Sequence, residues 1–173
     1  MVLARVIAFL IDYVVLGFYG AAVFGIAISL GWDERISSPL VGQLTGFISL
    51  TLPVVLYFSL LECSPWHASV GKRILRLEVT SLTPKSASFL ELLIRNLAKF
   101  LPWEIAHFGI HWAFYFNRNG DVLPAWVWIP LVFSQLLAIA YGASLVLDSK
   151  NRALYERWSG TMVAKRAGIG NPD

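Results

Sequence analysis

Charged residues are scarce in this sequence, and those present are unevenly placed. They make up 14% of the 173 residues, whereas 57% are hydrophobic. A soluble domain carries about a quarter charged residues. Here the charges are sparse within long apolar runs and dense between them, a distribution typical of a chain surrounded by lipid. The composition therefore predicts an integral membrane protein and argues against an ordinary soluble domain.

The sequence also has only one cysteine and lacks the common enzyme motifs. Cys63 is the only cysteine, so no internal disulfide can form. There is no nucleophile elbow of the G-x-S-x-G type, no phosphate loop and no spacing that assembles a catalytic triad. We therefore predict that the chain is not an enzyme and uses no cofactor. The basic residues flank apolar runs, so we expect the bilayer and its anionic headgroups as partners, and no nucleic acid.

Long apolar runs are what the chain does have. A helix needs about 20 apolar residues to cross the hydrocarbon. Three runs meet this need clearly, at about 6–30, 40–61 and 122–147, and a shorter one lies at about 100–116. Four crossings leave only Arg35 and Arg118 outside the cell, in line with the positive-inside rule. The sequence predicts an all-α, four-helix transmembrane bundle in the plasma (inner) membrane, with both termini cytoplasmic.

Residues 1–173 then form one domain with a cytoplasmic insert at 62–99 and a cytoplasmic tail at 148–173. Within the insert, apolar and polar residues alternate over 74–80, which predicts a short strand or hairpin. Ser88 stands three residues before Glu91 and predicts a capping box at the start of an amphipathic helix. We expect that helix, about 89–99, to end before Pro102 turns the chain into the membrane.

Asp12 is the candidate site residue that stands out most, because it is the only charge inside the first apolar run. A carboxylate within a membrane helix costs a few kcal/mol, so it should face the protein interior near a cation or a donor. Arg5 lies two helical turns earlier on the same face. Two interpretations stay open: an internal ion pair that holds the bundle together, or a site for a cation or proton.

A second candidate group lies in the weakest span. Glu104, His107 and His111 are spaced so that they share one face of a helix. A carboxylate and two imidazoles could bind a divalent metal ion or relay protons. The alternative is a polar stripe that lines a water-filled crevice, so the three residues are weak metal candidates.

Two basic clusters flank the apolar runs. Lys72 and Arg73 precede the predicted strand, and Arg152 and Arg157 follow the last span. Basic pockets at a cytoplasmic membrane edge can bind lipid headgroups. The simpler interpretation is that these residues set the topology.

Four segments together resemble the RDD family of membrane proteins. The first is Arg5 to Asp12, where an arginine starts the helix and an aspartate lies inside it. Segments 68–79, 93–97 and 152–163 resemble the family's Gly-Lys-Arg segment with its short strand, its next arginine-bearing helix and its closing motif, in the same order. Glu156 stands where the family has its second aspartate, Tyr155 replaces a histidine, and Ser69 replaces a threonine.

The resemblance implies a multi-pass membrane protein with a suggested transport function, and cation/proton exchange is attributed to some members. Asp12 would then bind the ion or proton, with Arg5 or Arg95 as counter-charge. Glu156 would lie near the cytoplasmic mouth, and the Glu104–His111 face could relay protons. Four helices are few for an antiporter, so we expect a homo-oligomer.

Two other functions remain open at this point. The chain could be a non-transporting scaffold or accessory subunit that docks a partner through the 62–99 insert. A less favoured alternative is an intramembrane metal-dependent enzyme built on the Glu104–His111 face.

Overall fold

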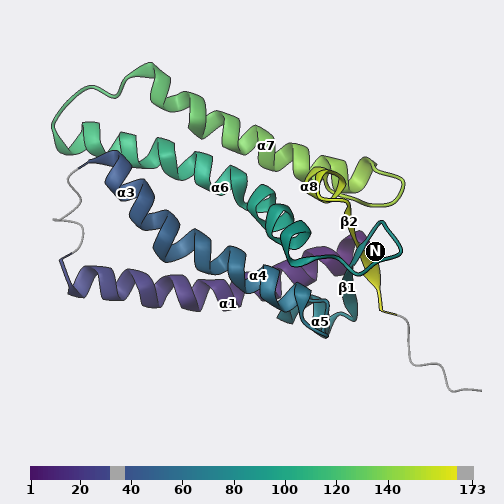
Figure 1. Cartoon of the computed structure of the whole chain (residues 1–173). Coiled ribbons are helices and arrows are strands. Elements are labelled where there is room, and N and C mark those ends of the chain that lie inside the picture. Colours follow the sequence, from purple (N-terminus) through teal and green to yellow (C-terminus); the bar gives the residue numbers. More distant parts are fainter. Residues whose placement is uncertain (32–37, 167–173) are drawn as a thin grey trace, which may run out of the picture.

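A computed structural model describes residues 1–31 and 38–166, so Arg35 lies outside the described residues. These residues form four long helical segments that run back and forth between the same two ends of the molecule (Figure 1). They are α1 (Val2–Ser29), the continuous run α3–η1–α4 (Pro39–Gly46, Phe47–Thr51, Leu52–Cys63), α6 (Phe89–Arg118), and η2 with α7 (Ala125–Val127, Trp128–Leu147). Four short elements gather at one end: α5 (Val70–Ile74), β1 (Leu77–Ser81), α8 (Leu154–Trp158) and β2 (Thr161–Lys165).

Three of the long segments are long and apolar enough to cross a membrane. They are Val2–Ser29, Pro39–Cys63 and Ala125–Leu147, which match three of the predicted spans. The fourth predicted span, at 100–116, is not a separate helix. It continues from the predicted amphipathic helix at 89–99, and together they form the 30-residue α6. The predicted break before Pro102 is therefore wrong.

A tyrosine explains why α6 continues through its proline. Pro102 has no backbone N–H, so the carbonyl of Ala98, four residues earlier, loses its helical donor. The hydroxyl of Tyr141 on α7 donates a hydrogen bond to that carbonyl over 2.9 Å. The bond satisfies a backbone acceptor that lipid could not satisfy, and it ties α7 to α6.

The same arrangement recurs in the second apolar segment. Pro53 deprives the carbonyl of Ser49 of its helical donor, and the chain passes through the π-helical turn η1 just before this proline. The Tyr19 hydroxyl on α1 donates to the Ser49 carbonyl over 2.6 Å. Each of the two prolines is thus matched by a tyrosine from a neighbouring helix.

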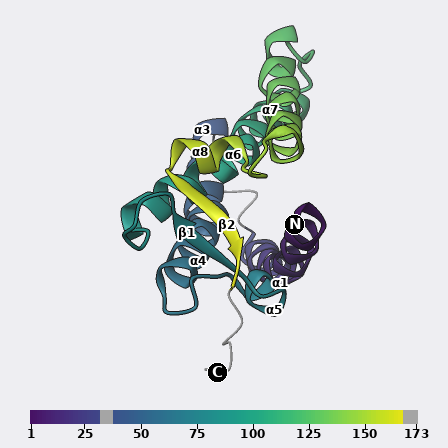
Figure 2. The same ribbon diagram turned by 90° about the vertical axis from the view of Figure 1, so that its right-hand side faces the viewer.

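The short sheet covers one end of the helices (Figure 2). β1 and β2 pair antiparallel, from Leu77 opposite Lys165 to Ser81 opposite Thr161. The predicted strand exists, but it begins later than position 74 because Val70–Ile74 is helical. Its partner comes from the C-terminal tail and not from a hairpin within the insert. The tail strand β2 was not predicted, since a five-residue strand there gives only a short signal.

Apolar side chains of the sheet pack against the helix ends. The buried core here consists of Ala8, Leu77, Val79, Leu92 and Val163. The insert and the tail are therefore joined both to each other and to the long helices α1 and α6.

The predicted capping box starts α6 as expected. The Ser88 N–H donates to the Glu91 carboxylate over 2.7 Å, and the Glu91 N–H donates to the Ser88 hydroxyl over 3.3 Å. These bonds satisfy two donors at the helix start and fix where α6 begins.

The pairing of Tyr141 with Pro102 can be tested by a double-mutant cycle. We expect Tyr141→Phe to lower the free energy of unfolding by about 1 kcal/mol, because the Ala98 carbonyl loses its donor. In a Pro102→Ala background the restored N–H at position 102 takes over that carbonyl, so the same change should cost much less. Unfolding in detergent measures both costs, and equal costs in the two backgrounds would contradict the pairing.

Candidate functional site

Ion pairs join five charged side chains at the end of the molecule that carries the sheet. They come from five different elements: Arg5 on α1, Glu62 on α4, Lys72 on α5, Arg95 on α6 and Glu156 on α8. All five are buried, and both carboxylates are fully inaccessible to solvent. We call these residues the charge cluster. It connects the predicted cytoplasmic insert and tail to the long helices.

Arg95 lies at the centre of the charge cluster. Its Nη1 donates to both oxygens of Glu62, over 2.9 and 3.1 Å, and its Nη2 donates to Glu156 Oε1 over 3.0 Å. Arg5 also donates to Glu156 Oε1, and to the carbonyl of Asn151. Lys72 Nζ donates to Glu62 Oε1 over 2.6 Å. The charges alternate along the cluster, so each buried carboxylate contacts two cations.

The surroundings complete the hydrogen bonding of the two carboxylates. Asn96 Nδ2 donates to Glu62 Oε2 over 3.0 Å, and the backbone N–H of Ala153 donates to Glu156 Oε2 over 3.1 Å. Burial alone would raise the pKa of Glu156, but Arg95 and Arg5 outweigh it, so the pKa of this carboxyl lies below its ordinary value. Glu156 therefore stays ionised and continues to hold both arginines.

Asp12 faces the protein interior, as predicted, but its partners are not the arginines. Its carboxylate is 2% exposed and accepts hydrogen bonds from Ser69 Oγ over 2.6 Å and from the Gly71 N–H over 2.8 Å. The Tyr57 hydroxyl lies 3.4 Å away. Of the two interpretations left open for Asp12, an ion pair is not found among the described residues, because Arg5 and Arg95 bind Glu156 instead.

Gly71 lets the α5 segment reach Asp12. A Cβ atom at this position would lie 2.0 Å from the carbonyl oxygen of Ala8 and 3.1 Å from the Asp12 carboxyl carbon. Only glycine therefore allows α5 to lie against α1 closely enough for its N–H to reach the carboxylate. The glycine of the Gly-Lys-Arg segment has a packing role that spacing alone did not reveal.

The Glu104, His107 and His111 face lies against the second apolar segment. Glu104 accepts hydrogen bonds from Gln43 Nε2 over 2.6 Å and from the Thr51 hydroxyl. His107 Nδ1 lies 2.9 Å from the carbonyl of Trp103, one turn earlier on its own helix. Within residues 1–31 and 38–166, no group of three or more His, Cys, Asp or Glu side chains could hold a metal ion.

The four predicted headgroup residues have different surroundings. Lys72 is buried and its amino group forms an ion pair with Glu62, so it is not available to bind a lipid headgroup. Arg73 is exposed and stacks over Trp66, 3.7 Å from the ring centroid, and Arg157 is also exposed. Arg152 binds Asp148 over 3.1 Å.

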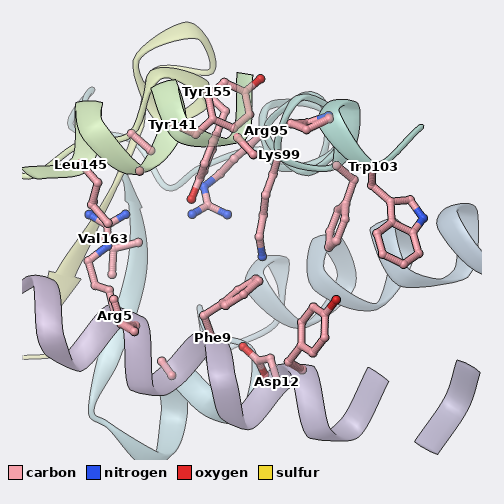
Figure 3. A pocket seen from close by; sticks show the side chains of 18 of the residues that line it. Arg5, Phe9, Asp12, Arg95, Lys99, Trp103, Tyr141, Leu145, Tyr155 and Val163 are labelled. Carbon is pink, nitrogen blue, oxygen red and sulfur yellow. The ribbon is translucent and has the colours of Figure 1, made fainter. Parts of the chain in front are cut away.

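A cavity of about 610 Å³ lies between α1, α6 and α7 and borders the charge cluster. Figure 3 shows Asp12 and Phe9 on one side of it and Lys99 reaching in from the opposite helix. Arg5, Lys72 and Arg95 also contribute to its lining. Most of the remaining wall is apolar or aromatic, and includes Phe100, Trp103, Tyr141, Leu145 and Tyr155.

Sequence reasoning missed two residues of this site. Glu62 was predicted to begin the cytoplasmic insert and was not selected as a site residue. In the structure its side chain is fully buried at the end of the second apolar segment. Lys99 was placed on an amphipathic helix at the membrane surface, yet it lines the cavity. The basic residues of the insert offered a signal for Glu62, since a buried arginine and lysine need a carboxylate nearby.

Substitution of Gly71 tests the close approach of α5 to α1. We expect Gly71→Ala to lower the free energy of unfolding by about 1–3 kcal/mol, because the added methyl group collides with the Ala8 carbonyl. Gly20→Ala on α1 is the matched control, since a Cβ there meets nothing within 4 Å in this chain. Equal thermal stability of the two variants in detergent would refute the tight contact.

The acid dependence of stability tests Glu156. A carboxyl whose pKa is lower in the folded than in the unfolded protein adds stability above the unfolded pKa, and this stability is lost as the pH falls through the folded pKa. We expect Glu156→Gln to destabilise the protein at pH 7 by on the order of 3 kcal/mol, because two buried arginines lose their counter-charge. The gap between the two melting temperatures should shrink once the pH falls below about 4.3, the ordinary glutamate pKa. A gap that stays constant down to pH 3 would exclude this role.

Comparison with known proteins adds one finding to this geometry. A family model described as RDD family matches residues 1–160. Neither the curated proteins nor the solved structures contain a match to the chain.

Proposed function

Because the chain belongs to the RDD family and forms a multi-pass membrane protein, we propose that it transports a small ligand through the cavity between α1, α6 and α7. The observation that carries this proposal is a cavity that borders buried charges inside an otherwise apolar bundle. Its volume of about 610 Å³ falls within the range of small-molecule sites, roughly 300–1,000 Å³. Ionisable side chains within membrane helices commonly mark substrate or proton pathways.

The topology that we propose has four crossings, with α6 as the fourth. The long segments alternate in direction, so α6 must return from the end that carries the sheet to the opposite end (Figure 1). The end with the sheet carries most of the lysines and arginines, whereas Arg118 lies at the far end of α6. By the positive-inside rule we therefore propose that the end with the sheet, and both termini, lie on the cytoplasmic side of the cell membrane.

A narrower form of the proposal is exchange of monovalent cations for protons. Asp12 lines the cavity, so a proton or cation that enters it could reach this carboxylate. The hydrogen bonds from Ser69 and Gly71 mean that protonation of Asp12 would also weaken the hold on α5. This connection offers a route by which the ion could change the position of a cytoplasmic element.

Transport is favoured over the scaffold hypothesis because the insert uses its apolar residues within the chain. Leu77 and Val79 are buried against α1 and α6, and β1 pairs with β2.

A homo-oligomer remains part of our proposal. Helix α1 carries three glycines at which an added Cβ would meet nothing within 4 Å: Gly17, Gly20 and Gly25. The surface of α1 at these glycines is therefore free to pack against a second copy of the chain.

Transport can be tested by filling the cavity in reconstituted protein. We expect wild-type vesicles to show proton flux driven by a gradient of at least one member of a panel of monovalent cations, small anions and alkyl phosphates. Ala138→Trp should abolish that flux, because the indole fills space lined by Ala138. Ile139→Trp is the matched control, since Ile139 is 65% exposed on the outside of the same helix.

The second arm of this experiment concerns the ion. If flux occurs and Asp12→Asn leaves it unchanged, the cation/proton form of the proposal is wrong while ligand transport stands. If no member of the panel produces flux, or if Ala138→Trp and Ile139→Trp behave alike, the cavity is not a transport route.

A further inference from the structure

Lys99 is a cation without a carboxylate partner in a cavity of membrane helices. Its Nζ lies 3.6 Å from the centroid of the Phe58 ring, 5.1 Å from that of Phe100 and 5.5 Å from that of Phe9. No ion pair or hydrogen bond to another described residue involves this nitrogen. Aromatic rings stabilise a cation by far less than the cost of moving a charge from water into an apolar site.

The residues around the cavity have one positive charge in excess. Four cationic side chains border it, Arg5, Lys72, Arg95 and Lys99, together with the carboxylate of Asp12. Glu62 and Glu156 lie behind them, and both are already bonded to the other three cations. Within the charge cluster three cations share two carboxylates, which leaves one positive charge over. The two remaining charges, Lys99 and Asp12, lie on opposite sides of the cavity and form no ion pair with each other (Figure 3).

A second hydrogen-bond donor in the cavity wall also lacks a partner. The Nε–H of Arg95 is buried and finds no acceptor in the part of the chain that the structure describes. Arg95 is 1% exposed and lines the same cavity as Lys99. Buried donors are almost always satisfied, so this N–H shows that the charge cluster is one acceptor short. Because the atom itself is inaccessible, the donor that the cavity offers to a ligand is the Lys99 amino group.

The rest of the wall restricts what that acceptor is attached to. The side of the cavity away from the charge cluster is formed by apolar and aromatic residues of α6 and α7, including Trp103, Ala106, Ala138 and Leu145. A small, fully hydrated anion would leave this surface uncovered. A ligand with one anionic group and an apolar portion would cover both parts of the wall.

We propose that the cavity is a binding site for an amphipathic anion, and that the Lys99 amino group binds its carboxylate or phosphate. The apolar part of the ligand lies along α6 and α7. The proposal names the substrate class of the proposed transporter. It concerns binding, so it stands even if the bound anion is not moved across the membrane.

Equilibrium binding to the full chain in detergent provides the test. The probes are decyl phosphate, its neutral counterpart decanol, and inorganic phosphate, each added below its own aggregation limit, and native mass spectrometry counts the bound molecules. We expect wild-type protein to bind decyl phosphate at least about tenfold more tightly than decanol, since a charge-assisted contact distinguishes them. Lys99→Met should remove that preference, and Lys99→Arg should keep most of it. Lys85→Met is the control, because Lys85 is an exposed lysine between β1 and α6.

Every result decides the proposal. Inorganic phosphate that binds as tightly as decyl phosphate would overturn the proposal of an amphipathic ligand, because the apolar wall would then contribute nothing to binding. Equal binding of decyl phosphate and decanol by wild type, or an unchanged preference in Lys99→Met, would overturn it.

Stability provides a second readout that does not depend on the ligand. Lys99→Met removes a half-buried charge that has no ion-pair partner among the described residues, so its melting temperature without added ligand should equal or exceed that of wild type. Added decyl phosphate should raise the melting temperature of wild type and leave that of Lys99→Met unchanged. A large loss of stability in Lys99→Met would show that Lys99 has a structural partner and would count against the binding role. Anion binding without any flux would leave the inference intact and disprove the transport proposal.

Discussion

Two carboxylates hold three cations together at the point where the membrane helices meet the sheet. Glu62 and Glu156 are inaccessible to solvent, and Arg95 connects them. In a low-dielectric interior a charge without a partner costs several kcal/mol, so each member of the cluster depends on the others. Since the members come from five elements, the arrangement of those elements depends on the same interaction. The positions of α5, α8 and the strands follow from it, and the cavity borders it.

The mode by which the helices pack elsewhere is consistent with a lipid environment. Where water is absent, a carbonyl freed by proline needs a donor from the protein. Tyr19 and Tyr141 supply that donor at two prolines and link neighbouring helices in doing so. Glycines act at the closest approaches: a Cβ at Gly42 would lie 2.7 Å from a His111 nitrogen, and one at Gly109 would lie 2.8 Å from Leu131. Small residues and polar side chains thus replace the hydrophobic effect as the source of helix packing.

The sequence predicted the features that depend on local chemistry. The length of the apolar runs predicted three helices that are long enough to cross a membrane, and the Ser88–Glu91 spacing predicted where α6 begins. The position of Asp12 inside an apolar run predicted that its side chain faces the protein interior. Features that depend on partners from elsewhere in the chain were missed. Pro102 signals a break in a lone helix, and only the Tyr141 hydroxyl from α7 makes its continuation understandable.

In the candidate site, too, the residues could be selected from local sequence but their partners could not. Arg5, Arg95 and Glu156 were selected as ionisable residues near membrane spans, and they do lie together. Their pairing could not be predicted, because Arg5 reaches Glu156 across 151 positions of sequence. Spacing along a helix indicated Asp12 as the partner of Arg5, whereas the fold brings the tail closer.

The place of Glu156 in the chain order has a consequence for biosynthesis. Glu156 and β2 follow all four long helical segments, so they leave the ribosome after α1, α4 and α6 have been made. Until then Arg5 has no carboxylate to bind, Arg95 has only Glu62, and β1 has no strand beside it. The ion pairs of Glu156 and the pairing of β1 with β2 therefore form last during synthesis. The C-terminal segment completes the fold of helices that have already been made.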